Sequence, residues 1–160
     1  MISRLIVLAS LAMLFQTAPS DAQDKKPPKR PLVAELEATK KSFPKGTVPT
    51  FKLKITNEGK APEKVLKLRG DLQDTYYDLE ISQSGKSVTV PRAISDPGPT
   101  TDNDYVTLKP GESVTFELKR FASAWQSLPV GKYTAVVRIW PPRQRANSFP
   151  SSEAMFEISK

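Results

Sequence analysis

The sequence predicts an all-β fold, a sandwich of two antiparallel sheets built from seven to eight short strands. In 51–56 and 114–119, apolar residues alternate with charged or hydroxyl-bearing ones. This period of two is typical of a strand with one face in a core and the other in water. No long amphipathic helical segment separates the strands, as a parallel α/β fold would require. Turn sequences containing Gly, with Asn, Ser or Pro, separate the runs at 57–59, 84–86, 109–112 and 129–131.

We expect the first strand within 32–41, where apolar residues alternate although most are also good helix formers. Between 121 and 128, Ala122, Ala124 and Trp125 stand between a strand and a turn. One helical turn there would carry the chain from one sheet to the other. The other expected strands contain the segments 51–56, 66–68, 77–81, 88–90, 114–119, 133–139 and 156–158.

The composition excludes most kinds of enzyme. The chain of 160 residues contains no Cys and no His, so it has no Ser-His-Asp or Cys-His nucleophile system, no thiolate redox chemistry and no ordinary zinc, copper or haem ligands. We therefore expect no bound metal or cofactor. A binding module remains, or an unusual catalyst built from carboxylates, Ser, Lys or Tyr.

The N-terminal residues 1–22 have the three parts of a secretory signal peptide. Arg4 precedes an apolar run from Leu5 to Phe15, and Ser20-Asp21-Ala22 provides small residues for cleavage after Ala22. The run is too short to span a membrane, so we expect no transmembrane anchor after processing and a secreted or periplasmic location. An exported domain without disulfides fits a bacterial origin better than an animal one.

Residues 23–31 form a basic, proline-rich linker, which we expect to be extended and disordered. Its four cations and one carboxylate leave a charge of +3, out of +7 for the whole chain. Such a tether acts as a solvated spacer, or it contacts an anionic surface of the cell envelope. The folded domain then spans 32–160, a size that forms one core.

Three segments carry a resemblance to bacterial immunoglobulin-like domains. Leu128, Gly131 and Tyr133 stand as in the Leu-x-x-Gly-x-Tyr tyrosine corner, whose Tyr hydroxyl bonds to nearby backbone. Residues 108–113 resemble the Leu-x-Pro-Gly-x-Ser turn of such domains, and 51–59 resemble their second strand. The resemblance implies an immunoglobulin-like sandwich over 32–160, and it implies no function.

Among named groups, the chain is most similar to immunoglobulin-like domains of the intracellular-proteinase-inhibitor type. The shared features are a strand ending in Asn-x-Gly, the acidic-aromatic strand at 76–79, the Pro-Gly-Glu turn and the Pro-x-Gly-x-Tyr turn. The sequence departs from that type in having an export signal and in lacking a Trp after the turn at Gly85-Lys86. We therefore take only the fold from this resemblance.

The segment 138–152 is the strongest binding candidate, because it connects the last two strands and is rich in Trp and Arg. These residue types predominate at binding hot spots, and loops at the end of a sandwich often contact partners. The alternative is a long hairpin whose Trp covers the edge of the sandwich and whose arginines are merely solvated. The candidate binding residues are Arg138, Trp140, Arg143, Arg145 and Phe149.

Three weaker candidates remain. The acidic loop 94–105 could supply oxygen ligands to calcium, although its spacing matches no established calcium loop. Asp71, Asp74, Asp78 and Glu80 are possible glycosidase carboxylates, yet alternation puts the last two on a wet strand face. A strand face with Lys52, Lys54 and Lys67 could attract an anionic polymer or lipid, or simply be solvated. We expect no nucleic-acid partner, since the charge is thinly spread.

Together these observations predict a secreted, non-enzymatic binding or structural module of a bacterial envelope or secretome. Its partner is expected to be a protein or envelope component that contacts the 138–152 loop. Two alternatives stay open, a proteinase inhibitor and a carboxylate-based hydrolase.

The signal peptide leads to a testable mass. The exported protein should begin at Gln23, because cleavage after Ala22 removes the apolar run. Intact-mass measurement of protein recovered from the exported fraction checks this expectation. A mass that still includes residues 1–22 would contradict it.

Overall fold

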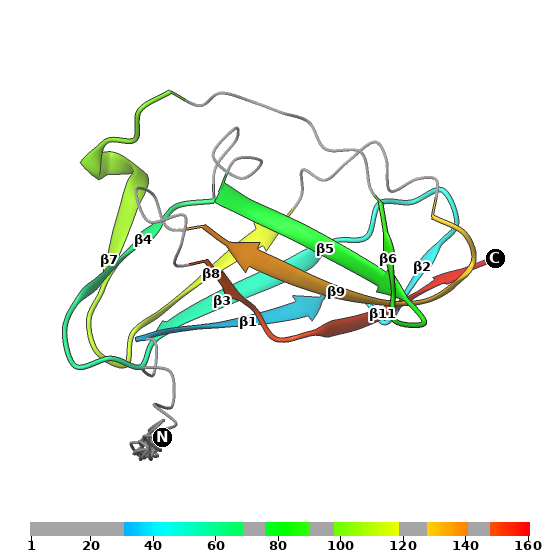
Figure 1. Cartoon of the computed structure of the whole chain (residues 1–160), viewed down its shortest axis with the longest axis horizontal. Helices are drawn as coiled ribbons and strands as arrows, with labels where there is room; N and C mark the ends of the chain where they lie inside the picture. The colour runs from blue at the N-terminus through cyan, green and yellow to red at the C-terminus, as the bar shows by residue number, and fades with distance from the viewer. Residues whose placement is uncertain (1–30, 69–75, 90–97, 119–127, 141–147) are drawn as a thin grey trace, which may run out of the picture.

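The computed structural model describes residues 31–68, 76–89, 98–118, 128–140 and 148–160. Within these ranges the chain is an all-β sandwich, which confirms the fold class (Figure 1). The strands of four or more residues are β1 (Leu32–Ala38), β3 (Phe51–Asn57), β4 (Glu63–Leu66), β5 (Tyr77–Gln83), β7 (Tyr105–Leu108), β8 (Ser113–Leu118), β9 (Gly131–Ile139) and β11 (Ala154–Ser159). Three shorter strands, β2 (Ser42–Pro44), β6 (Lys86–Val88) and β10 (Phe149–Pro150), have two or three residues each.

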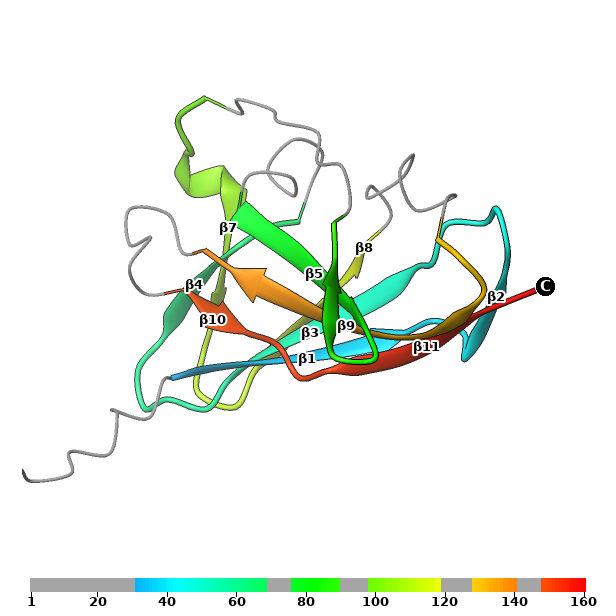
Figure 2. The same ribbon diagram turned by 45° about the vertical axis from the view of Figure 1, so that its right-hand side comes forward.

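The strand order is that of an immunoglobulin-like sandwich. One sheet has the order β1-β3-β8, and the other has the order β2-β11-β9-β5-β6, with β10 added to β9. Strands β4 and β7 form a separate two-stranded ribbon at one end of the molecule (Figures 1 and 2). The pairings are antiparallel except that β2 runs parallel to β11, so the expectation of purely antiparallel sheets is wrong at that edge.

Several strand boundaries differ from the expected ones. The first strand ends at Ala38, and the next one, β2, pairs with the opposite sheet. Strand β4 stops at Leu66, so Leu68 lies beyond it. The expected helical turn at 121–128 falls, except for Leu128, outside the described residues, as does Val90.

The core lies between the two sheets and is centred on aromatic rings. The Phe156 ring of β11 stacks on Tyr133 at a centroid distance of 5.4 Å and meets Phe51 of the opposite sheet edge-on at 5.4 Å. Phe43 of β2 makes a third, edge-on contact at 6.1 Å. Because these rings come from both sheets, they join the layers directly, and no disulfide is available to do so.

Asn57 is a buried polar residue that connects two turns, the one after β3 and the one after β7. Its side chain is fully buried, and its Nδ2 donates to the carbonyls of Ala61 and Leu108, each at 2.8 Å. Its Oδ1 accepts the N–H of Gly59 at 2.9 Å. Its backbone pairs with the Pro-Gly turn, since the N–H of Gly111 donates to the Asn57 carbonyl at 2.7 Å. The Asn of the Asn-x-Gly sequence thus has a structural role, because its buried side chain bonds to the backbone of both turns.

The tyrosine corner has the geometry that its motif predicts. The Tyr133 hydroxyl donates to the Pro129 carbonyl at 2.7 Å, and Leu128 before it is buried. A methyl group at Gly131 would meet the end of the flexible Gln83 side chain, which would have to shift. Tyr77 makes a comparable bond to the Leu66 carbonyl at 2.6 Å, and burial raises the pKa of its hydroxyl above the ordinary value.

Replacing Asn57 tests its structural role. Asn57→Ala should lower the free energy of unfolding by about 2–4 kcal/mol, because it leaves several buried backbone groups without partners. Chemical denaturation measures the loss. The control is Thr56→Ala at the neighbouring, partly exposed position, whose hydroxyl pairs only with that of Ser113, and it should cost less than about 1 kcal/mol. Equal losses in the two variants would contradict the role given to Asn57.

Candidate functional site

The structure places Arg138 in a strand and not in a loop, so the expectation that it belongs to a connecting loop is wrong. It lies on the outer face of β9, where its Nε donates to Glu80 Oε1 of β5 at 2.7 Å. The hydrogen bond and the negative charge of Glu80 raise the pKa of Arg138. Both side chains are partly exposed, and the pair closes a cross-strand contact. Arg138 is therefore already engaged within the sheet.

Phe149 also differs from expectation. It forms β10 opposite Ile139 of β9, and its side chain is 7% exposed and belongs to the core. Trp140 continues β9, because its backbone N–H donates to the carbonyl of Tyr76 at 2.8 Å. The residue is partly exposed. Arg143 and Arg145 lie outside the described residues. Only the ends of the 138–152 segment are thus described, and both ends join the sheet.

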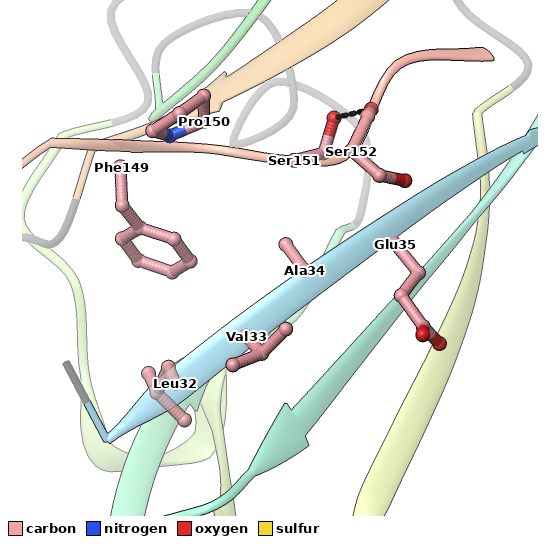
Figure 3. Close-up of a pocket in the computed structure, with 8 residues that line it drawn as sticks. All are labelled: Leu32, Val33, Ala34, Glu35, Phe149, Pro150, Ser151 and Ser152. Carbon is pink, nitrogen blue, oxygen red and sulfur yellow. Dashed lines mark hydrogen bonds between the residues drawn. The ribbon is translucent and has the colours of Figure 1, made fainter. Parts of the chain in front are cut away.

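A groove runs between the last residues of this segment and the first strand. Its volume is about 480 Å³, and its walls are Leu32–Glu35 of β1 and Phe149–Ser152 (Figure 3). Phe149 projects from one wall towards β1, and the two backbones converge at Ser152. The groove is therefore a wedge with apolar side chains at its wide end and a closed narrow end.

Ser152 closes the narrow end with two hydrogen bonds, which we call the Ser152 clasp. Its N–H donates to the Ala34 carbonyl at 2.9 Å, and its Oγ accepts the N–H of Leu36 at 3.0 Å. In a parallel ladder, one residue of a strand bonds to two residues of its neighbour that are two positions apart, and Ser152 bonds to Ala34 and Leu36 in this way. The hydroxyl of Ser152 takes the place of its carbonyl, which accepts the Ser151 hydroxyl at 2.8 Å instead.

The ladder is not continued beyond Ser152 among the described residues. Its next bond would run from the N–H of Ala34 to the carbonyl of Pro150 and is not formed, and the one after it would need an N–H at residue 150, which proline lacks. On its other side the same segment is tied to β9, where the N–H of Ser151 donates to Val137 at 2.8 Å. The wall is therefore fixed to β9, and in the described residues Ser152 alone bonds its backbone to β1.

The edge of β1 that faces the groove carries open backbone groups. The Pro31 carbonyl and the Thr39 N–H pair with the β3 side, so odd-numbered residues of β1 face β3. The even-numbered residues face the groove, as the two bonds of the Ser152 clasp show. The N–H and C=O of Leu32 and the N–H of Ala34 have no hydrogen-bond partner among the described residues.

The acidic loop does not gather its carboxylates. Lys64 Nζ lies 2.9 Å from Asp102 Oδ1, while the buried Asp104 accepts the N–H and hydroxyl of Thr101. In the parts of the chain that the structure describes, no three acidic side chains are grouped to hold a metal ion. The first residues of the loop, 94–97, are outside those parts.

Two of the four carboxylates considered for hydrolysis are described, and they lie away from the groove. Asp78 and Glu80 share the outer face of β5, where Glu80 binds Arg138. Asp71 and Asp74 are outside the described residues. The groove itself contains a single carboxylate, Glu35, which lies 3.1 Å from Lys54.

The lysines of β3 are interleaved with acids. Across the outer face, Lys54 is opposite Glu35 of β1, and Lys52 lies between Glu37 and Glu117. Lys67 lies elsewhere, its Nζ donating to the carbonyl of Asn103 at 2.9 Å. The pairing of strands thus cancels the basic face that the sequence of one strand suggests.

Sequence reasoning missed the β1 side of the groove. Leu32–Glu35 was assigned only as a strand, because its alternation gives no indication of which edge remains unpaired. The one sequence signal was Pro150, since proline in a sheet marks an edge without an N–H. That signal identifies an edge but does not say which strand lies across from it.

The comparisons with known proteins give no family. No protein-family model matches the chain, and no curated protein matches it by sequence. In the described residues, no helix has the length and apolar character to cross a membrane.

Three solved structures are similar at low levels. An alkylpurine DNA glycosylase of Pseudomonas fluorescens bound to abasic-site DNA has a TM-score of 0.43 and 12% identity, over 82% of this chain and 31% of that one. A β-glucosidase of Erythrobacter marinus has a TM-score of 0.41 and 15% identity, over 80% and 15%. The CARDB domain of a Pyrococcus furiosus protein has a TM-score of 0.35 and 12% identity, over 81% and 93%. This chain thus spans under a third of the first two, and none of the three bears on its function.

The Ser152 clasp can be tested by removing one hydroxyl. Ser152→Ala should cost about 1 kcal/mol of stability, because the Leu36 N–H loses its acceptor, and the Leu36 amide should exchange faster with deuterium. Denaturation and amide exchange measure the two effects. Ser159→Ala is the matched control, since that hydroxyl makes only a 3.4 Å contact with Phe43. A Leu36 amide that exchanges equally in both variants would exclude the clasp.

Proposed function

We propose that this protein is an exported, non-enzymatic binding module of a bacterial envelope or secretome, and that its partner is a protein. The supporting observation is the groove between β1 and Phe149–Ser152, where apolar side chains lie beside unpaired backbone groups. Exposed apolar surface and open sheet edges are the features that proteins use to bind other chains. The far wall, Phe149–Ser152, is the C-terminal end of the 138–152 segment.

Binding fits the chemistry of the groove better than catalysis does. Its two hydroxyl groups have structural partners, since Ser151 Oγ accepts the Val137 N–H and Ser152 Oγ accepts that of Leu36. Its one carboxylate, Glu35, has a lysine beside it and no second carboxylate in the groove lining. General acid-base catalysis needs a pair of titratable groups with different pKa values, and the groove does not offer one.

The export signal and the linker complete the proposal. Residues 1–22 direct the chain to the periplasm or beyond, and the basic linker at 23–31 provides a second contact with an anionic envelope surface. Pro31, the last residue of that linker, is held at the entrance of the sandwich, because its carbonyl accepts the Glu58 N–H at 2.7 Å.

A capture experiment with matched variants tests this function. The purified chain should retain a specific protein from the exported fraction of the producing organism, and Leu32→Ala should reduce the yield several-fold because it removes apolar contact area. The double variant Arg143→Ser, Arg145→Ser should do the same if the 138–152 segment takes part. Lys64→Ser on the β4–β7 ribbon is the control and should capture normally. If Leu32→Ala and the double variant both capture as much partner as the unaltered chain, this surface is excluded as the binding site.

A further inference from the structure

We infer that one end of the sandwich docks onto a phospholipid bilayer whose headgroups are negatively charged. The docking surface, which we call the basic end, combines exposed lysines with the two large apolar side chains that are exposed in the described residues. None of its residues lines the groove. The inference therefore goes beyond the protein partner proposed above and does not depend on it.

Strand pairing gathers the basic end from distant parts of the chain. The carbonyl of Lys41, just before β2, accepts the Glu157 N–H of β11 at 3.0 Å, and Glu157 is opposite Lys132 of β9. The Lys45 N–H, just after β2, donates to the carbonyl of Ser159 at 2.9 Å. The loop around β2, the start of β9 and the C-terminus accordingly lie together, at the right in Figures 1 and 2.

The hairpin of β5 and β6 extends this surface past β9. Its Lys86 is paired with Gln83, and the side-chain amide of Gln83 lies against Gly131, the residue before Lys132. The larger sheet therefore presents lysines across its whole width at this end. The lysines of the basic end are Lys40, Lys41, Lys45, Lys86, Lys132 and Lys160, and all of them are exposed.

The positive charge of these lysines is not neutralised locally. Among the residues that the structure describes, none of the six forms an ion pair, whereas Lys54, Lys64 and Arg138 each do. Strand pairing places one carboxylate, Glu157, between them. The basic end thus has an excess of five positive charges, while the whole of 32–160 has an excess of four. The charge of the domain is concentrated at one end, which favours an oriented approach to an anionic surface.

Two exposed apolar side chains flank Lys132 on this surface. Val130 is 42% exposed and lies two residues before Lys132, in the turn that leads into β9. Met155 is 81% exposed, and on the outer face it is opposite Thr134, which places it diagonally across from Lys132. No other large apolar side chain in the described ranges is exposed. The exposed apolar groups therefore coincide with the free positive charge.

This combination fits a bilayer better than a soluble polyanion. Each lysine near an anionic membrane surface strengthens binding about fivefold, and apolar side chains leave water at the boundary between headgroups and acyl chains. An acidic polysaccharide would attract the same lysines, but it has no apolar layer to receive Val130 and Met155. The six ammonium groups also have no fixed partner, so they can follow a fluid layer of headgroups.

Vesicle sedimentation with the purified exported chain tests the docking. The protein should bind vesicles of equal parts phosphatidylglycerol and phosphatidylcholine but not vesicles of phosphatidylcholine alone, and high salt should release it. Three substitutions at the basic end should weaken binding about tenfold or more. They are combined in one variant, Lys41→Gln, Lys45→Gln and Lys132→Gln.

The matched control removes the same charge from the end with the β4–β7 ribbon. Its three positions are exposed, and it should bind vesicles nearly as well as the unaltered chain does. Equal losses in the two triple variants would overturn the proposal, because binding would then follow net charge alone. The control substitutions are Lys60→Gln, Lys64→Gln and Lys109→Gln.

The basic linker is examined in the same assay, because its cations also attract anionic vesicles. Both triple variants are repeated in a chain whose linker cations are replaced by Gln. The difference between them should persist there. If it disappears, the linker makes the membrane contact, and the role of the basic end is overturned. The linker substitutions are Lys25→Gln, Lys26→Gln, Lys29→Gln and Arg30→Gln.

A fluorescent label distinguishes a bilayer from a soluble polyanion. Because the chain has no Cys, Val130→Cys provides a single position for a polarity-sensitive dye. Its emission should rise and shift to the blue on vesicle binding, whereas the same dye at Thr107→Cys on the ribbon should not change. Dextran sulfate should leave both dyes unchanged. A dye at residue 130 that does not respond to bound vesicles would overturn docking on a bilayer and indicate a polyanion site.

Two single variants separate this inference from the proposed function. Val130→Ser should weaken vesicle binding several-fold, because it removes an apolar side chain from the contact. Leu32→Ala, in the groove, should bind vesicles normally. A loss of vesicle binding in Leu32→Ala but not in Val130→Ser would place the membrane contact at the groove and overturn the basic end. Failure of vesicle binding in the unaltered chain would overturn the docking and leave partner capture through the groove unaffected.

Discussion

The two hydrogen bonds of the Ser152 clasp decide how the sheets meet at their shared edge. They hold β1, the edge strand of one sheet, against the chain that leads into β11 of the other. Before Ser152, no further backbone bond joins the two segments among the described residues, and they separate into a groove. The same feature thus fixes the first strand to the sandwich and leaves part of its backbone open. The proposed binding surface depends on this balance.

The rest of the sandwich is held by packing and by buried polar bonds. The chain has no Cys, and the rings around Phe156 come from both sheets, so apolar contact takes the role that a disulfide has in many secreted domains. Asn57 and Tyr77 fix turns and strand ends by donating to backbone carbonyls. These bonds fulfil the rule that a buried polar group must have a partner. A rigid frame of this kind keeps the groove walls in place.

Sequence reasoning was most successful where the signal is local. Alternation identified most of the longer strands, because side chains of a strand point to opposite faces in turn, but it missed β2, β7 and β10. The tyrosine corner was readable because its hydroxyl bonds to a carbonyl only four residues away. It failed at Arg138 and Phe149, which lie in β9 and β10 and not in a free loop. Their partners, Glu80 and Ile139, are decided by strand pairing between distant segments, which a linear pattern does not encode.

The sequence by itself determined the all-β class and most of the longer strands, since these follow from short-range periodicity. Only the tertiary structure decided which charges meet and which edge remains open. Lys52 and Lys54 form a basic stripe in the sequence, yet the register of β1 and β8 places acids beside them. Likewise, Pro150 is a local fact, but the groove exists because the fold sets it opposite Leu32, more than a hundred residues earlier in the chain.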